Sequence, residues 1–333
     1  MGFTIDYDAL AAKILGHNPK SVLLQGPDGL KTKLVEIVKE LQKRTPYEYV
    51  TLVEPAWGSC DLADEKAVKM QCDLLVHFGH NMIYPGKVKT IFWPLSPDIN
   101  IQPVLDKLVE VLSKENLLEV GLAASSQFTP MFNDIIDYLE KKGIGCHTSS
   151  GSGRVKDPGQ VLGCNYTVVH NLDEDVQAIV YFGDGLFHPI GIAFSTKKRI
   201  ITANPYSNTV KELTSERDVF LRKRYALLSQ CANATKFGII VSLKSGQLYM
   251  TVARRLKKLI ESKGKQAFIL LSDFTYPDYF VGLDVDCYVN TACPRLAIEN
   301  YQEFNKLMIN PKELEIALSA RKFSEYEFEE LLY

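Results

Sequence analysis

The sequence predicts an α/β protein of three similar domains, each a small, mostly parallel sheet flanked by helices. Two observations lead to this prediction. One pattern, an apolar strand followed by a polar loop and an amphipathic helix, occurs three times along the 333 residues. The strands are short, continuous apolar runs, which are typical of parallel sheets covered on both faces. A chain of 333 residues also has the length of two or three ordinary domains.

Each unit is expected to open with a strand and a polar loop. The three strands are SVLLQ at 21–25, EVGLAAS at 119–125 and KFGIIVSL at 236–243. The loops GPDGLK, SQFTP and KSGQ follow them. In the segment after each loop, apolar residues recur three and four positions apart, which is the spacing of one helix face that covers a sheet.

Two further apolar runs complete each unit. After the helix come YVTLVE, GIGCHT and AFILLSD, and later come DLLVHFGH, QAIVYFGD and CYVNTACPR. We place the boundaries near residues 113 and 233, so the expected domains are 1–113, 114–233 and 234–333. The second boundary follows a charged helix expected at 208–232, and the chain from Pro311 onward is expected to form a helix and an acidic tail.

The composition argues against several classes of function. The formal net charge is −2, whereas a protein whose main role is to bind nucleic acid typically carries an excess of basic residues. The apolar runs are all well short of the about 20 residues of a membrane span. The N-terminal segment lacks the basic and apolar stretches of a secretory signal. We therefore expect a cytoplasmic protein that neither acts on a membrane nor binds nucleic acid directly.

Seven cysteines are spread over the chain: Cys60, Cys72, Cys146, Cys164, Cys231, Cys287 and Cys293. They form no CxxC pair, which argues against a local zinc ribbon or ferredoxin loop. Their odd number and a reducing compartment disfavour a disulfide framework. A metal site built from these cysteines must therefore be assembled by the fold.

Three of the cysteines lie in loops, one in each unit, and the other four are expected to be buried thiols. Cys60 stands in PAWGSCD, Cys164 in QVLGCNY and Cys293 in NTACPR. Because ligands of parallel sheets bind beyond the strand ends, three units around a pseudo-threefold axis would direct these loops to one centre. Spacing alone supports a shared metal site and three ordinary thiols equally. Three thiolates on a four-iron cluster would leave one iron open to a substrate.

Seven phrases spread over all three units carry a resemblance: LLQGPDGLK, EPAWGSCD, QVLGCNY, YFGDGLFHP, ITANPY, LRKRYALL and NTACPRL. In this order they resemble the archaeal type of 2-(3-amino-3-carboxypropyl)histidine synthase, a family of diphthamide biosynthesis. The resemblance implies three domains of one topology around a central [4Fe-4S] cluster. By position, Cys60, Cys164 and Cys293 match the cysteines that bind this cluster.

The resemblance also implies an unusual radical reaction of S-adenosylmethionine. In this reaction the open iron holds the methionine part. Ordinary radical S-adenosylmethionine enzymes break the bond to the adenosyl carbon, whereas cleavage of the other S–C bond in this family leaves methylthioadenosine. The released 3-amino-3-carboxypropyl group joins the imidazole C2 carbon of one histidine of translation elongation factor 2, the first step toward diphthamide. The implied partners are this acceptor protein, an electron donor and a second copy of the chain in a homodimer.

Seven further residues are assigned to the surroundings of S-adenosylmethionine or the cluster: Gln25, Gly26, Gly29, Gly183, Asp184, His188 and Arg295. For the first three, a turn that begins a helix explains the sequence equally well. His188 stands beside a proline, where a structural role is the usual one, and Arg295 could offer its charge to a substrate carboxylate or the cluster. Metal ligation by His77 or His80 is not expected. The basic run at 222–224 is expected to be a solvated helix face.

Three alternatives stay open. Quinolinate synthase also resembles three α/β units that share a three-cysteine [4Fe-4S] cluster, but it catalyses a condensation and dehydration. A cluster-free partner subunit is the second, and a ligand-binding α/β protein with ordinary core cysteines is the third. Iron content separates the partner subunit and the ligand-binding protein from the two cluster enzymes, and formation of methylthioadenosine separates the diphthamide enzymes from quinolinate synthase.

Overall fold

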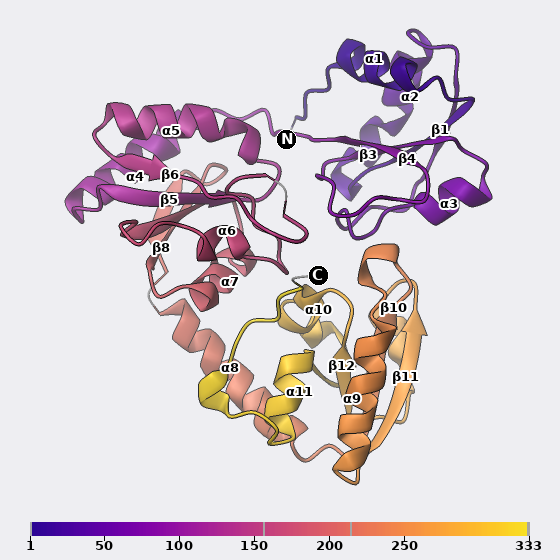
Figure 1. Ribbon diagram of the computed structural model, residues 1–333, viewed down its shortest axis with the longest axis vertical. Helices are drawn as coiled ribbons and strands as arrows, with labels where there is room; N and C mark the ends of the chain where they lie inside the picture. Colours follow the sequence, from indigo (N-terminus) through magenta and orange to yellow (C-terminus); the bar gives the residue numbers. More distant parts are fainter. Residues whose placement is uncertain (1, 156, 214, 332–333) are drawn as a thin grey trace.

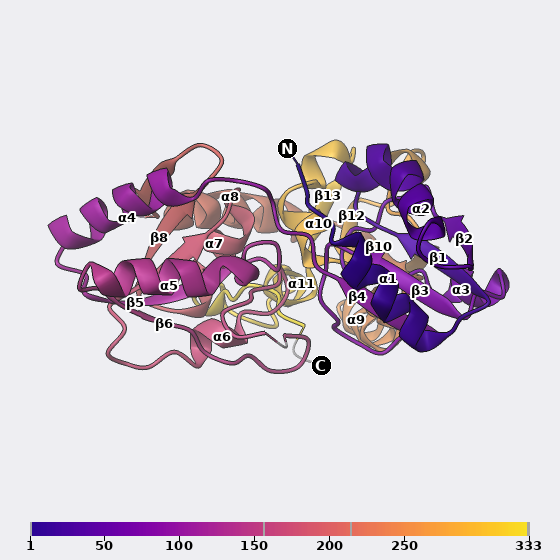
Figure 2. The ribbon, with the colours of Figure 1, turned by 90° about the horizontal axis from the view of Figure 1, so that it is seen from above.

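The computed structural model describes residues 2–155, 157–213 and 215–331 and shows three α/β units, each with its own sheet (Figure 1). Seen from above, the first and third units overlap and the second lies to one side (Figure 2). No helix in the described parts of the chain is long and apolar enough to cross a membrane. The predicted class, three similar domains with mostly parallel sheets, is confirmed.

The first unit contains a parallel sheet in the order β2-β1-β3-β4. Its strands are β1 (Ser21–Gln25), β2 (Glu48–Thr51), β3 (Leu74–Phe78) and β4 (Lys89–Trp93). Its helices are α1 (Tyr7–His17), the 3₁₀ turn η1 (Asp28–Lys33), α2 (Leu34–Gln42) and α3 (Asp64–Lys69). Leucine and isoleucine side chains of α1 and α2 pack on the buried face of β1 and β3, which explains their helical spacing.

The second unit has the same parallel order and adds one antiparallel strand, giving β6-β5-β7-β8-β9. Its strands are β5 (Glu119–Ala124), β6 (Gly145–His147), β7 (Ala178–Phe182), β8 (Arg199–Asn204) and β9 (Thr209–Glu212). Its helices are α4 (Gln102–Lys114), the 3₁₀ turn η2 (Thr129–Met131), α5 (Phe132–Lys141), α6 (Thr167–His170) and α7 (Phe187–Ser195). One face of the sheet is covered by α4 and α5 and the other by α6 and α7.

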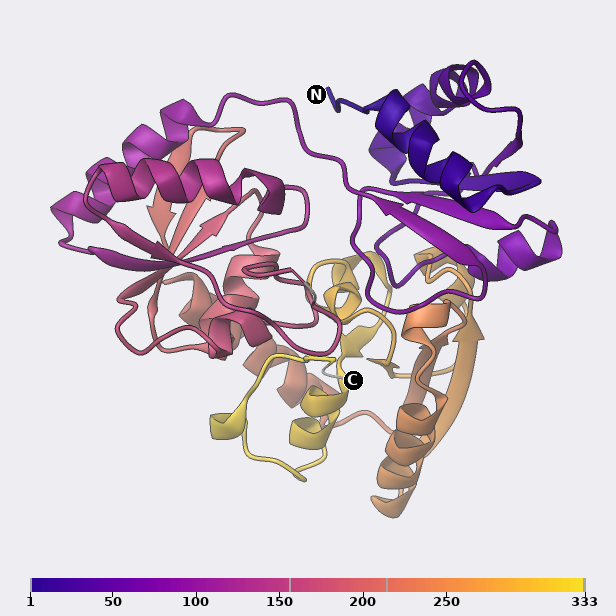
Figure 3. The same ribbon diagram turned by 45° about the horizontal axis from the view of Figure 1, so that its top comes forward.

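The third unit again has the order β11-β10-β12-β13. Its strands are β10 (Lys236–Ser242), β11 (Gln266–Ser272), β12 (Cys287–Asn290) and β13 (Leu307–Ile309). Its helices are α8 (Glu216–Cys231), the 3₁₀ turn η3 (Ser245–Gln247), α9 (Met250–Ser262), α10 (Pro294–Ile298) and α11 (Pro311–Ala317). The long helix α9 lies along β10 and β11 (Figure 3).

The repeat begins one helix earlier than the sequence pattern indicated. Helices α1, α4 and α8 each precede the central strand of a sheet and pack into that unit's core. Leu227, Leu228 and Cys231 of α8, for example, contact the core of the third unit. The boundaries near residues 113 and 233 stay predictions, and both fall at the end of such a helix.

Three details differ from the sequence-based expectations. The helix expected at 208–232 begins only at Glu216, because Thr209–Glu212 forms β9 and pairs with β8. Each sheet has a further parallel strand, β4, β8 or β13, that the pattern did not reveal. The basic run at 222–224 is not wholly solvated, because Arg224 is only 2% exposed and is paired with a buried carboxylate.

Candidate functional site

The three loop cysteines follow the carboxyl ends of strands in three different sheets. Cys60 lies between β2 and α3, and Cys164 lies between β6 and α6. Cys293 follows β12 and is the N-cap residue of α10. As whole residues these three cysteines are partly exposed, whereas Cys72, Cys146, Cys231 and Cys287 are buried as expected.

The three thiols lie within electrostatic reach of one another. Burial, followed by the charges of Cys293 and Cys60, raises the pKa of Cys164 to about 12. Burial and then Cys60 raise the pKa of Cys293 to about 11. Among the described residues, no three Cys, His, Asp or Glu side chains are grouped closely enough to hold a single metal ion. A four-iron cluster takes one cysteine per iron, so its ligands stand farther apart than those of a single ion.

The loop of Cys60 is held by the 3₁₀ turn η3 of the third unit. The Gln247 side-chain amide donates to Cys60 Sγ across 3.1 Å, and the Gly246 N–H donates to the Cys60 carbonyl oxygen across 3.1 Å. Lys244 Nζ forms an ion pair of 2.6 Å with Asp61, and both side chains are largely buried. A Cβ atom on Gly246 would lie 2.5 Å from Cys60 Cα, so the two loops meet backbone to backbone.

Arg154 of the second unit reaches the same place. Its Nη2 donates to the Gly246 carbonyl oxygen across 3.0 Å and to the Tyr249 hydroxyl. Its guanidinium charge favours the thiolates of Cys60 and Cys164 and acts against the burial that raises the pKa of both thiols. Arg154 therefore links the second and third units at the point where the cysteines converge.

The loop of Cys164 is held by the last described residues of the third unit. The Leu331 N–H donates to the Cys164 carbonyl oxygen across 2.6 Å. The Tyr166 N–H donates to Glu330 Oε2 across 3.0 Å. Phe328 packs against the ring of Tyr166, so this segment forms a strap from the third unit to the second.

Arg295 lies two residues after Cys293 and brings a positive charge near its thiol. The Arg295 N–H and guanidinium both lower the pKa of the Cys293 thiol, against the larger effect of burial. The exposed guanidinium forms an ion pair with Glu299 and lies 5.2 Å from the centre of the Phe187 ring. Its predicted contact with a substrate carboxylate stays a prediction.

Gln25 holds the Cys60 loop through hydrogen bonds to its main chain. Its side chain is 2% exposed, donates to the Asp61 carbonyl oxygen across 2.6 Å and accepts from the Ala63 N–H across 2.9 Å. It also lies 2.9 Å from His77 Nδ1. The neighbouring glycines differ, because a Cβ on Gly26 would meet Leu30 at 2.7 Å, while one on Gly29 would make only an ordinary contact of 3.9 Å with Phe3. A binding role for these three residues stays a prediction beside the structural role of Gln25.

His188 stacks on a tyrosine in the second unit. Its ring lies 5.8 Å from that of Tyr181, and its Nδ1 is 3.3 Å from the Tyr181 hydroxyl. Burial and the charge of Arg295 lower the pKa of His188 to about 4, so its imidazole is neutral at pH 7. Gly183 has φ +152°, a value that favours glycine, and Asp184 is exposed. The roles predicted for these residues in ligand binding stay predictions.

The family model for diphthamide synthesis proteins matches residues 26–328. The chain belongs to this family. The chain is 35% identical over 315 residues to the 2-(3-amino-3-carboxypropyl)histidine synthase of Pyrococcus horikoshii. This match covers 94% of this chain and 89% of that protein. It is 30% identical over 320 residues to subunit 1 of the synthase of Caenorhabditis elegans. That match covers 95% of this chain and 80% of the subunit.

A solved structure agrees with these sequence relatives. The crystal structure of Dph2 from Pyrococcus horikoshii with a 4Fe-4S cluster superimposes with a TM-score of 0.90 at 31% identity. The match covers 99% of this chain and 95% of the other. The family and the enzyme class expected from the sequence, a 2-(3-amino-3-carboxypropyl)histidine synthase, are confirmed by these comparisons.

Three functional candidates of this diphthamide-family chain were missed by sequence reasoning: Arg154, Lys244 and Gln247. A signal existed for two of them, because KSGQ is the third unit's counterpart of GPDGLK and stands at the end of a central strand. Arg154 stands in a serine- and glycine-rich loop with no pattern, and only the fold brings it to the cysteines.

Proposed function

We propose that this chain binds a [4Fe-4S] cluster through Cys60, Cys164 and Cys293. With it, the chain would transfer the 3-amino-3-carboxypropyl group of S-adenosylmethionine to a histidine imidazole carbon of translation elongation factor 2. The observation that carries the proposal is that three thiols from three units lie within electrostatic reach of one another. Thiolates are the usual ligands of iron–sulfur clusters, so the donor set fits the group.

Three cysteines leave one iron without a protein ligand, and this position would receive the methionine part of S-adenosylmethionine. When bound and reduced, the cluster supplies the electron that cleaves an S–C bond and frees the 3-amino-3-carboxypropyl group. The protein's own contribution is electrostatic. Arg154, Lys244 and Arg295 each favour a thiolate at one or more of the cysteines, so they offset the negative charge gathered there.

Arg295 differs from the other two cations in its exposure. Lys244 is largely buried in its ion pair with Asp61, whereas the Arg295 side chain is 53% exposed. An exposed guanidinium beside Cys293 can exchange its partner Glu299 for a substrate carboxylate, which it would bind through two parallel hydrogen bonds. We assign to Arg295 the carboxylate of the transferred group, and to the loop of Gln25, Gly26 and Gly29 and to Gly183, Asp184 and His188 the rest of the ligand's surroundings.

The proposed partners follow from the reaction. The acceptor is translation elongation factor 2, which places the enzyme in the cytoplasm, where translation takes place. One-electron reduction also requires an electron donor. Two archaeal relatives are named as synthases without a subunit number, so we propose that a single kind of chain is sufficient and acts as a homodimer.

The test is a single-turnover reaction of anaerobically reconstituted protein with S-adenosylmethionine and dithionite, with the nucleoside products separated. We expect methylthioadenosine from the unaltered chain and its loss in Cys60→Ala, Cys164→Ala and Cys293→Ala. Cys146→Ala, which changes a buried thiol inside β6, is the matched control and should retain the product. A cluster that yields no methylthioadenosine would favour the chemistry of quinolinate synthase, and full activity of Cys164→Ala would exclude the proposed ligand set.

A further inference from the structure

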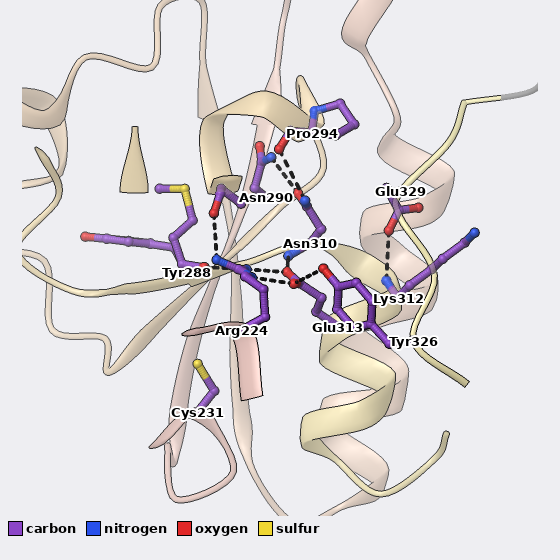
Figure 4. A network of polar contacts seen from close by, with 12 residues as sticks. Arg224, Cys231, Tyr288, Asn290, Pro294, Asn310, Lys312, Glu313, Tyr326 and Glu329 are labelled. Carbon is purple, nitrogen blue, oxygen red and sulfur yellow. Dashed lines mark hydrogen bonds and ion pairs between the residues drawn. The ribbon is translucent and has the colours of Figure 1, made fainter. Parts of the chain in front are cut away.

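A buried polar network lies beside Cys293, between α8, the end of β12 and the start of α11 (Figure 4). Its four central members, Arg224, Asn290, Asn310 and Glu313, are each 2% exposed or less. Buried polar and charged groups cost free energy unless they are fully paired. Each of these four side chains has hydrogen-bond partners, and several of the partners belong to the segment that carries Cys293.

Asn290 holds the turn that leads to the cysteine. It is the last residue of β12. Its Nδ2 donates to the Cys293 carbonyl oxygen across 2.8 Å, and its Oδ1 accepts from the Ala292 N–H across 3.1 Å. One side-chain amide therefore fixes the main chain at two points within the turn.

Asn310 holds the next peptide group. This N-cap residue of α11 accepts from Asn290 Nδ2 across 2.9 Å and donates to the Pro294 carbonyl oxygen across 3.2 Å. The carbonyl oxygens of Cys293 and Pro294 are thus each held by a buried amide, and the two amides hold one another. The main chain on both sides of the Cys293–Pro294 peptide bond has little freedom to move.

The ion pair between Arg224 and Glu313 anchors these amides. Arg224 Nε lies 2.6 Å from Glu313 Oε1 and Nη2 lies 2.5 Å from Oε2. Glu313 Oε2 also accepts from the Asn310 N–H across 2.9 Å. Arg224 Nη1 donates to the Ala297 carbonyl oxygen across 2.9 Å, which ties the pair to α10, the helix that Cys293 caps.

We propose that Arg224, Glu313, Asn310 and Asn290 form a positioning network that holds Cys293 in place as an iron ligand. An apolar core of similar volume would support the fold as well as a buried ion pair does, but it would not orient two consecutive carbonyl groups. Partners behind a metal ligand fix its orientation in the same way at other metal sites. The inference depends on the proposed function only in taking Cys293 as a ligand.

The first test uses the metal-free full chain and measures the alkylation rate of each cysteine by iodoacetamide with peptide mass spectrometry. In Asn290→Ala we expect Cys293 to react roughly fivefold faster, as the loss of a hydrogen bond of about 1 kcal/mol allows, with Cys60 and Cys164 unchanged. Asn310→Ser should behave alike, because serine still caps α11 but loses the contact with Pro294. Asn300→Ala, which removes an exposed contact with Glu303, is the matched control.

The second test measures iron release from the reconstituted chain to a chelator, which we expect to be roughly tenfold faster in both variants. Circular dichroism checks that each variant is folded, and Asn310→Ser decides the question if Asn290→Ala does not fold. Unchanged alkylation of Cys293 together with unchanged iron release in a folded variant would overturn the network's role. If the unaltered chain binds no iron, the proposed function fails, and the alkylation rates alone decide the positioning role.

Discussion

The side-chain amide of Gln247 donates a hydrogen bond to Cys60 Sγ across 3.1 Å, and the two residues belong to the third and the first unit. The bond is accompanied by the ion pair of Lys244 with Asp61 in the same pair of loops. The sulfur of a cysteine in one unit therefore accepts a hydrogen bond from a side chain of another unit. Hydrogen bonds to ligand sulfurs are among the features that set the reduction potential of a cluster.

We expect Gln247→Leu to make the reduction potential of the reconstituted cluster more negative. The physical reason is that the amide donor stabilises negative charge on the sulfur, and the reduced cluster carries one more negative charge than the oxidised one. A potentiometric titration followed by electron paramagnetic resonance measures the shift. Gln302→Leu, an exposed glutamine bonded to Tyr301, is the control, and an equal potential in Gln247→Leu and the unaltered chain would contradict the prediction.

We expect Gly246→Ala to separate the first and third units. Its Cβ would lie 2.5 Å from Cys60 Cα and 2.8 Å from the Cys60 carbonyl oxygen, and backbone atoms cannot rotate away. Overpacking of this kind typically costs about 1–3 kcal/mol. The measurement is the iron content after reconstitution, together with the free energy of unfolding. We expect less iron to be bound, and iron binding at the normal level would contradict the prediction.

The matched control for this change is Gly16→Ala. Gly16 lies inside α1, and a Cβ there would meet nothing within 4 Å. Because alanine is the better helix former, this variant should keep its iron and gain about 0.5–1 kcal/mol of stability.

We expect stability to fall as the pH falls below about 6.5, and His77 to contribute to the loss. Its side chain is fully buried, and burial followed by the charge of His80 lowers its pKa from 6.5 to about 3. The unfolded chain therefore takes up a proton before the folded chain does, so its stabilising contribution is lost as the pH drops. Between pH 7 and pH 5 this amounts to about 2 kcal/mol for one histidine.

Denaturant unfolding at these two pH values compares the unaltered chain with His77→Gln. The variant should lose less stability on acidification, because glutamine takes up no proton in either state. His17→Gln at the exposed end of α1 is the control. A variant that loses as much stability as the unaltered chain would assign the acid sensitivity to other groups.

We expect Arg224→Met alone to be far more destabilising than Arg224→Met combined with Glu313→Leu. The single change leaves the Glu313 carboxylate buried without a cation, which typically costs about 3–5 kcal/mol. The double change removes both charges and replaces them with apolar volume, so it should recover much of this loss. Chemical denaturation measures both. Arg255→Met, which breaks an exposed pair with Glu315, should cost little, and a double variant as unstable as the single one would contradict the argument.

The threefold repeat could be predicted because each central strand is a continuous apolar run flanked by polar loops. The first strand was expected at 21–25, and β1 spans Ser21–Gln25. The further strands β4 and β13 carry weaker signals, since β4 begins with a lysine and β13 has three residues. Short edge strands depend on pairing with a neighbour more than on their own composition.

The residues of the candidate site, too, could be predicted only in part. The cysteines could be singled out because each stands in a loop with glycine or proline, one in each unit. Arg224 could not be predicted to be buried, because its partner Glu313 lies 89 positions along the chain and no local pattern links the two. The basic run around it is typical of an exposed helix face, and its other two residues, Arg222 and Lys223, are indeed exposed.

The strap formed by Phe328, Glu330 and Leu331 has a consequence for how the protein is made. During synthesis, domains fold as they leave the ribosome, so the first and second units can form before the third exists. The Cys164 loop, however, gains its contact with Leu331 only after that residue has emerged and folded back onto the second unit. Iron delivered to the growing chain at that stage would meet only two of the three thiols, Cys60 and Cys164. Assembly of the proposed metal centre would then have to wait until the residues of the strap have been synthesised.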